Sequence, residues 1–227
     1  MKTALGMGLI VLALLAAGSI APAQQMSGGS AKKPTIASTL DFQLTIVEHE
    51  ITGAAEAMPE DKYSFAPTNG EFKGVRTFAQ EVKHIATANN RFFGAILGEE
   101  PMTGTVEDVG SNGPDSIQTK EQILQYLKES FDKGHKAIAT ITDANALGPV
   151  DHPPVPFLRG RMQLAMFACV HAFDHYGQMV EYLRDNGIVP PATQQRQRGP
   201  QGGAQSGPQG GPQGGMAQPG TAPPPGR

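Results

Sequence analysis

Two histidines in the C-terminal half of the chain have the spacing of metal ligands. They lie in the stretch His171-Ala172-Phe173-Asp174-His175-Tyr176-Gly177-Gln178. Residues four apart on a helix project from one face, one turn apart, so both imidazoles can bind one ion, and Gln178 shares that face. The same spacing also occurs on solvated helix faces. The flanking residues are mostly apolar, and a buried helix makes two unpaired imidazoles costly, which favours a metal site.

Two familiar metal sites are excluded by residue type. A zincin protease needs Glu directly after the first histidine, as the general base of H-E-x-x-H, and Ala172 occupies that position. A ferritin-like di-iron bundle needs two E-x-x-H motifs and two further carboxylates. Only the stretch from Glu81 to His84 fits that motif. The pair therefore predicts a mononuclear site that needs a third ligand.

The spacing alone does not choose the third ligand among His49, His84, His135 and His152. His84 lies on an amphipathic segment but at the edge of its apolar face. His135 is flanked by lysines and a glycine, and His152 lies in a proline-rich stretch. Surface positions are the simpler interpretation for both of these histidines.

The elements that must position these side chains are four predicted helices. Apolar residues recur at helical spacing over about 38–57, 77–98, 119–141 and 158–186. Ser38 is the predicted N-cap of the first, and T-x-x-Q capping boxes open the second and third. Asn186-Gly187 ends the fourth. Gly134 weakens the third slightly.

Four amphipathic helices of this length bury their apolar stripes most simply against one another. The predicted fold class is therefore all-α, a four-helix bundle, and no alternating run predicts a sheet. The connections between the helices are long and rich in Gly and Pro. Such connections allow a crossover in place of strict up-and-down order.

Both ends of the chain differ in composition from the domain. Residues 1–23 have the charged, apolar and small-residue regions of a secretory signal, with cleavage expected after Ala23. We expect a flexible lead-in over 24–35, the domain over 36–191 and a disordered Gln-, Gly- and Pro-rich tail over 192–227. The mature protein is expected to be soluble, exported to the periplasm or the cell exterior, and without a stable membrane anchor.

The composition of the chain excludes some kinds of binding partner. Cys169 is the only cysteine, so an intrachain disulfide is excluded. The formal net charge is -3, and the predicted domain is more acidic because the tail carries three of the arginines. An acidic domain argues against nucleic acid and anionic membranes. A small-molecule substrate fits better, and an exposed apolar stripe would allow a homodimer.

The order of these motifs resembles the DinB-like family. The resemblance rests on Val82-Lys83-His84-Ile85-Ala86 in the second helix and on His171-x-x-x-His175-x-Gly177-Gln178 in the last. The stretch from Pro59 to Pro67, leading into Arg76-Thr77-Phe78, also looks like that family's link between its first two helices. The resemblance covers about 35–191.

The resemblance implies a four-helix bundle that holds nickel, zinc, iron or manganese, and it selects His84 as the third ligand beside His171 and His175. Ala172 and Tyr176 depart from a common family pattern of Asp and Arg, which puts the contacts around the ligands in doubt. Characterised relatives include thiol-dependent transferases and isomerases, whereas many others have no established activity.

The expected function is therefore a metal-dependent enzyme, either a thiol-dependent transferase or hydrolase-like. Gln178 and Tyr176 are the candidate substrate contacts, and Glu81 and Asp174 are the nearest carboxylates for proton transfer. The alternative is a noncatalytic metal-binding or stress-response protein in which the ion stabilises the bundle. A third interpretation leaves the histidines in the core without a metal.

Overall fold

The computed structural model describes residues 33–101 and 112–198. Its long helices are α1 (Ile36–Ala57), α2 (Phe78–Leu97), α3 (Lys120–Ala139) and α4 (Arg161–Asp185). The prediction of an all-α fold with four main helices is confirmed. The predicted signal and the tail beyond Arg198 lie outside the described residues, as does nearly all of the lead-in.

The helix ends follow the capping residues of the sequence, with one correction. Thr77 and Thr119 form the predicted capping boxes at the starts of α2 and α3. For α1 the N-cap is Thr35, and the predicted cap Ser38 is instead the third helical residue, which completes the box. Asn186 ends α4 as predicted, followed by Gly187 in the left-handed conformation.

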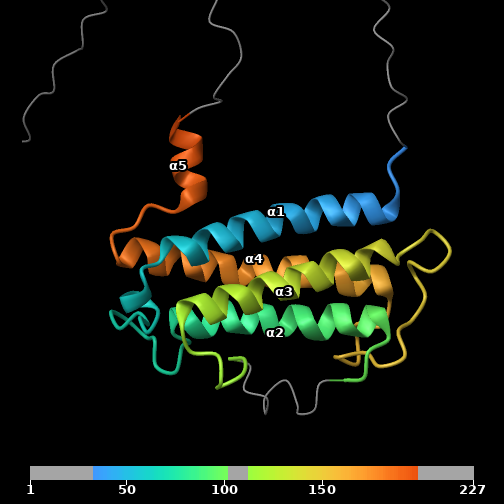
Figure 1. Ribbon diagram of the computed structural model, residues 1–227, viewed down its shortest axis with the longest axis horizontal. Helices are drawn as coiled ribbons and strands as arrows, with labels where there is room; N and C mark the ends of the chain where they lie inside the picture. Colours follow the sequence, from blue (N-terminus) through green and yellow to red (C-terminus); the bar gives the residue numbers. More distant parts are fainter. Residues whose placement is uncertain (1–32, 102–111, 199–227) are drawn as a thin grey trace, which may run out of the picture. The chain divides into compact units, whose positions relative to one another are not determined.

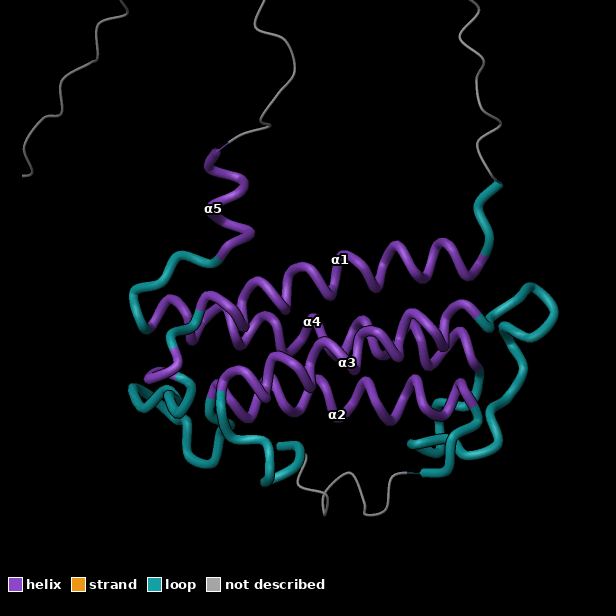
Figure 2. The backbone as a smooth tube through the Cα atoms, viewed as in Figure 1, coloured by secondary structure: helices purple, strands orange, loops and turns teal. Residues whose placement is uncertain are grey.

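The four long helices lie side by side in a bundle with a crossover. Figure 1 shows α1 and α4 running in one direction and α2 and α3 in the other. Each helix therefore packs against one parallel and one antiparallel neighbour, and α2 lies between α3 and α4. The connection from Gly98 to Thr119 returns the chain to the end at which α2 begins. Figure 2 shows helices and loops but no strand in the described part of the chain.

Two buried or half-buried lysines hold this connection and the start of α3 in place. Lys83 is 8% exposed and donates hydrogen bonds from Nζ to the carbonyl oxygens of Pro114 and Ile117, at 3.0 and 3.1 Å. Lys120 donates to the carbonyl oxygens of Glu56 and Met58, which stabilises the exposed carbonyl end of α1. The part of the connection from Pro114 onward is thus held against α2, and the start of α3 is held against the end of α1.

The core lies between the four helices and is close-packed. Its largest fully buried side chains are Phe78, Phe93, Phe131, Leu44, Ile51, Met58, Ile85, Ile123, Leu127, Ile138, Leu164 and Met179. Gly134 of α3 faces Leu44 of α1 and Phe93 of α2. A Cβ atom there would lie 2.8 Å from both Leu44 Cδ2 and Phe93 Cε2. The glycine that the sequence marks as a weak point of the helix is therefore a packing requirement.

A short helix, α5 (Pro191–Arg198), follows α4 and lies beside α1. Helical structure thus continues past the boundary at residue 191 that the composition predicts. Gln195 Nε2 lies 3.2 Å from His49 Nε2, and Pro191 packs near Gly53. Within residues 33–101 and 112–198, no helix combines the length and apolarity that a bilayer crossing requires.

Candidate metal centre

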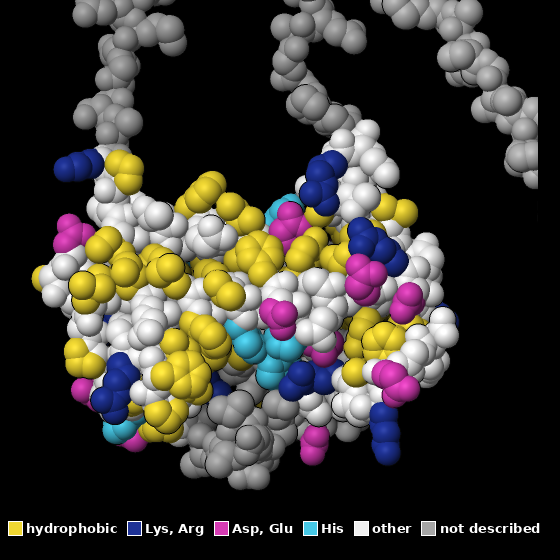
Figure 3. All heavy atoms as spheres, turned by 180° about the vertical axis from the view of Figure 1, so that it is seen from behind, with side chains coloured by type: hydrophobic (Ala, Val, Ile, Leu, Met, Phe, Trp, Pro, Cys, Tyr) yellow, Lys and Arg dark blue, Asp and Glu magenta, His cyan; other side chains and the backbone are white. Residues whose placement is uncertain are grey.

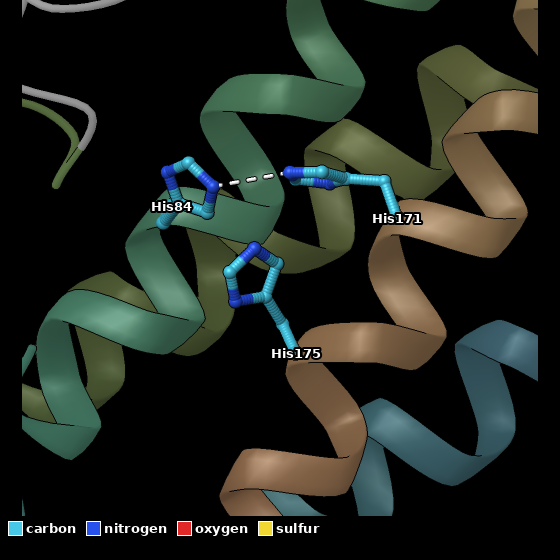
Figure 4. Close-up of side chains that lie close together, drawn as sticks. All are labelled: His84, His171 and His175. Atoms are coloured by element: carbon cyan, nitrogen blue, oxygen red, sulfur yellow. Dashed lines mark hydrogen bonds between the residues drawn. The ribbon is translucent and has the colours of Figure 1, made fainter.

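Three histidines from two antiparallel helices point toward one another. His171 and His175 lie one turn apart on α4, and His84 projects from α2 between them (Figure 4). Their ligand atoms all lie within 4.8 Å of one another, and the Nε2 atoms of His84 and His171 are 3.1 Å apart. The structure thus brings together the three residues that the family resemblance selects.

The spacing of these nitrogens suits a divalent transition-metal ion. Nitrogens that each bind one ion at about 2.1 Å are themselves separated by about 3.0 Å in octahedral geometry and about 3.4 Å in tetrahedral geometry. The 3.1 Å between the Nε2 atoms of His84 and His171 lies between these two values. Imidazole is also a ligand type that zinc, iron and nickel accept. The donor set therefore fits a divalent transition-metal ion, as the resemblance implies.

A buried carboxylate contacts the Nδ1 side of the His175 ring. Nδ1 of this ring lies 2.7 Å from Glu81 Oε2, one turn before His84 on α2. Glu81 is 1% exposed, and its other oxygen lies 4.0 Å from Arg76 Nη1. A histidine ligand whose second nitrogen donates to a carboxylate is the usual arrangement around metals in proteins.

His171 is held in its neutral form. Burial, followed by the charges of His175 and Arg76, lowers the pKa of His171 to about 4. Its Nδ1 atom is buried and has no hydrogen-bond partner in the structure. A neutral imidazole carries the lone pair that a metal ligand needs. The remaining cost of burying this polar ring is what coordination of an ion would offset.

Aromatic rings and apolar side chains border the histidines on one side. The rings of Phe92 and Phe167 contact each other and that of His171, at centroid distances of 5.3 to 6.1 Å. His84 and His175 are buried, whereas His171 is partly exposed. Figure 3 shows histidine side chains at the surface in the middle of one face, next to hydrophobic side chains. The site is thus shielded but accessible.

The two predicted substrate contacts have different positions. Gln178 lies beside the site, with Nε2 3.4 Å from His175 Nδ1. Tyr176 instead faces α1, where its hydroxyl donates a 2.7 Å hydrogen bond to Glu50. Burial and this hydrogen bond raise the pKa of Tyr176. The structure therefore does not place Tyr176 with the histidines, because its position on α4 turns it toward the neighbouring helix.

The other candidate ligands are elsewhere. His135 lies between Asp41 and Glu48 of α1, at 2.6 and 3.0 Å, and is half-buried where the sequence suggested solvent. His49 lies next to α5, and His152 is exposed, as predicted.

From the sequence, Glu81 was a candidate for proton transfer and not a partner of His175, and Arg76 was part of the link to the second helix and not a residue of the site. The E-x-x-H spacing that places Glu81 and His84 on one face of α2 was the available signal. Arg76 precedes the N-cap of α2, outside any helical pattern. Its Nε donates to Asn112 Oδ1 at 2.9 Å, a contact across the long connection that no local spacing indicates.

The chain matches the sequence model of the DinB superfamily over residues 43–179, which is more than half of its length. The match includes most of α1 and α4, all of α2 and α3, and all three histidines. No curated protein matches the chain.

Proposed function

Because the chain belongs to the DinB superfamily, we propose that it is a metal-dependent enzyme whose divalent ion is held by His84, His171 and His175. The reaction class is group transfer to or from a small molecule, with either a thiol or water as the attacking group. Nickel, zinc, iron and manganese are the candidate ions.

The observation that carries this proposal is the composition of the cluster. Among residues 33–101 and 112–198, it contains three imidazoles and no fourth ligating side chain. A structural site usually closes its shell with four protein ligands, whereas a catalytic site keeps a position open. Three protein ligands leave a coordination position open, which favours a catalytic site over a structural one.

The ion and the chain have separate tasks in this proposal. A divalent ion held by three neutral imidazoles keeps its full charge, so it lowers the pKa of a bound water or thiol and polarises a carbonyl. Phe92 and Phe167 limit the access of bulk water to His171. Gln178 lies on the Glu81 side of His175, with its Nε2 3.4 Å from Nδ1, so this contact does not place its carboxamide at the open position of the ion.

The choice between thiol and water depends on where the protein works. The signal-like residues 1–23 support a location outside the cytoplasm. Low-molecular-weight thiols are mainly cytoplasmic reductants, so export favours water. Cell fractionation followed by mass spectrometry tests this step. A chain that begins at Gln24 outside the cytoplasm is expected, and a chain found only in the cytoplasm would contradict export.

The alternative is a noncatalytic protein in which the ion stabilises the bundle. Its support is that the ligands come from α2 and α4, so an ion would tie these neighbouring helices together. This alternative uses the same three histidines but needs no open position.

Metal loading tests the proposal first. The purified protein is dialysed against each candidate ion, and metal content is measured for the wild type and for H84A, H171A and H175A. H152A is the matched control, because His152 is exposed and distant in sequence from the cluster. About one ion per chain in the wild type and in H152A, lost in the three cluster variants, is the expected result.

The open position is tested on the cobalt-loaded protein. Azide or a simple thiol is added, and the visible absorption spectrum is recorded. A spectral change that saturates supports an exchangeable position and thus the enzyme. An unchanged spectrum favours the structural ion, and a wild-type protein that takes up no metal overturns both functions.

A further inference from the structure

Glu81 is a buried carboxylate next to the cluster. It is 1% exposed, and its two oxygens face different partners: Oε2 lies 2.7 Å from His175 Nδ1, and Oε1 lies 4.0 Å from Arg76 Nη1. A buried carboxylate is costly unless it is paired and hydrogen-bonded. Both conditions are met here, because His175 lies within hydrogen-bond distance of one oxygen and Arg76 is paired with the other.

This contact determines which nitrogen of His175 carries the proton. An ionised carboxylate only accepts hydrogen bonds, so Nδ1 must donate. A neutral imidazole has one N–H, and the lone pair is therefore on Nε2. Figure 4 shows one ring nitrogen of His175 directed toward His84 and His171. The lone pair thus lies on the side of the ring where an ion would bind.

Arg76 is itself held from two other parts of the fold. Its Nε donates to Asn112 Oδ1 at 2.9 Å, and its backbone carbonyl accepts a hydrogen bond from the Tyr182 hydroxyl at 3.0 Å. Asn112 belongs to the connection before α3, and Tyr182 belongs to α4. The guanidinium is therefore fixed independently of Glu81, which keeps the carboxylate in place.

We propose that Glu81, supported by Arg76, is a positioning residue that fixes the tautomer and ring orientation of His175 for metal binding. The inference rests on the proposed function. Glu81 contacts the nitrogen of His175 that faces away from the cluster, so it is not placed to act as the base that its residue type suggests. His171 lacks a comparable contact, because its buried Nδ1 has no hydrogen-bond partner. The contact with Glu81 therefore distinguishes His175 from His171.

Metal affinity in matched variants tests this role. We expect E81L to weaken zinc binding about 10- to 100-fold, measured by chelator competition. E81Q should weaken zinc binding less, because its amide oxygen can still accept a hydrogen bond from the Nδ1–H of His175. E129Q is the control: Glu129 is an exposed acid on α3 that accepts a hydrogen bond from Gln125, so its substitution removes the same charge away from the cluster, and the zinc affinity of E129Q should match that of the wild type.

A second readout separates positioning from a merely structural contribution. Long-range ¹H–¹⁵N spectra of the metal-free protein report the tautomer of each histidine, and H175N identifies the signals of His175. The expected pattern is a proton on Nδ1 of His175 in the wild type and a mixture of tautomers in E81L. If E81L is too unstable to study, the tautomer of His175 is compared between the wild type and E81Q instead.

The outcomes distinguish this inference from the proposed function. Wild-type zinc affinity in folded E81L, or a proton on Nε2 of His175 in the wild type, overturns the positioning role and leaves the metal function intact. A wild type that binds no metal overturns the proposed function, and the tautomer spectra then still test the contact with Glu81.

Discussion

The bundle contains two groups of histidine contacts that differ in how many ring nitrogens lie next to a carboxylate. Between α2 and α4, His175 has a carboxylate on one nitrogen only, and its second nitrogen faces two other imidazoles. Between α1 and α3, His135 has a carboxylate on each nitrogen, Asp41 at 2.6 Å and Glu48 at 3.0 Å. Both rings are attached to helices of the same bundle, and only their partners differ.

This difference shows that the partners of a histidine determine its role. Two carboxylates require both nitrogens of His135 to donate, which is possible only for the charged imidazolium. That ring has no lone pair left for a metal. One carboxylate leaves His175 a lone pair, and His171, whose pKa is lowered to about 4, also stays neutral. The first group is an ion pair between helices, and the second is a candidate ligand set.

The largest expected effect separates the two groups by their response to metal. An ion that binds only the folded protein should raise its free energy of unfolding by about 2.7 kcal/mol at 100 times the dissociation constant. Urea unfolding with and without zinc measures this. The increase should occur in the wild type and in H135N but not in H84A. An equal increase in H84A would contradict the assignment of the metal to the cluster.

A smaller effect concerns the packing that brings α3 close to α1 beside His135. Because a Cβ at Gly134 would lie 2.8 Å from Leu44 and Phe93, G134A should destabilise the fold by about 1 to 3 kcal/mol. Its better helix propensity, about 1 kcal/mol, does not offset this clash. Urea unfolding midpoints provide the measurement.

Gly177 supplies the matched control for that substitution. It lies within α4, and apart from its chain neighbours and the nearby backbone of its own helix no atom lies within 4 Å of the position of its Cβ. G177A should therefore be neutral or stabilising by up to about 1 kcal/mol. Equal effects of G134A and G177A would show that the close approach of the helices at Gly134 does not limit stability.

The fold was predictable because its signals are local. The apolar spacing of the helices and the boxes at Thr77 and Thr119 depend on residues within a few turns. The pair His171 and His175 was predictable for the same reason. The choice of His84 required the family resemblance, because helix geometry places it at the edge of the apolar face and only the packing of α4 against α2 buries it.

The remaining contacts of the sites depend on which helices become neighbours. His135 was expected in solvent because its sequence neighbours are lysines, yet its partners come from α1, far away in sequence. Tyr176 was a substrate candidate because it lies next to His175, yet it faces Glu50. Spacing identifies residues on one face of a helix, but it does not identify the helix that the face will meet.

The smallest expected effect is the pH dependence of the ion pair at His135. Burial alone lowers the pKa of His135, but the hydrogen bonds and charges of Asp41 and Glu48 outweigh it, and the net result is a raised pKa. The unfolded chain has an ordinary histidine pKa of about 6.5. A raised folded pKa means that the stabilisation is complete below about 6.5 and is lost as the pH rises through the folded value.

Comparison of the wild type with H135N at two pH values measures this contribution. Because all three side chains are 30 to 50% exposed, the difference in unfolding free energy should be at most about 1 kcal/mol. It should be larger at pH 6 than at pH 9 and should decrease in high salt. A difference that grows with pH would mean that His135 is neutral in the folded protein. One of its nitrogens would then carry a lone pair, and the contrast with the metal cluster would fail.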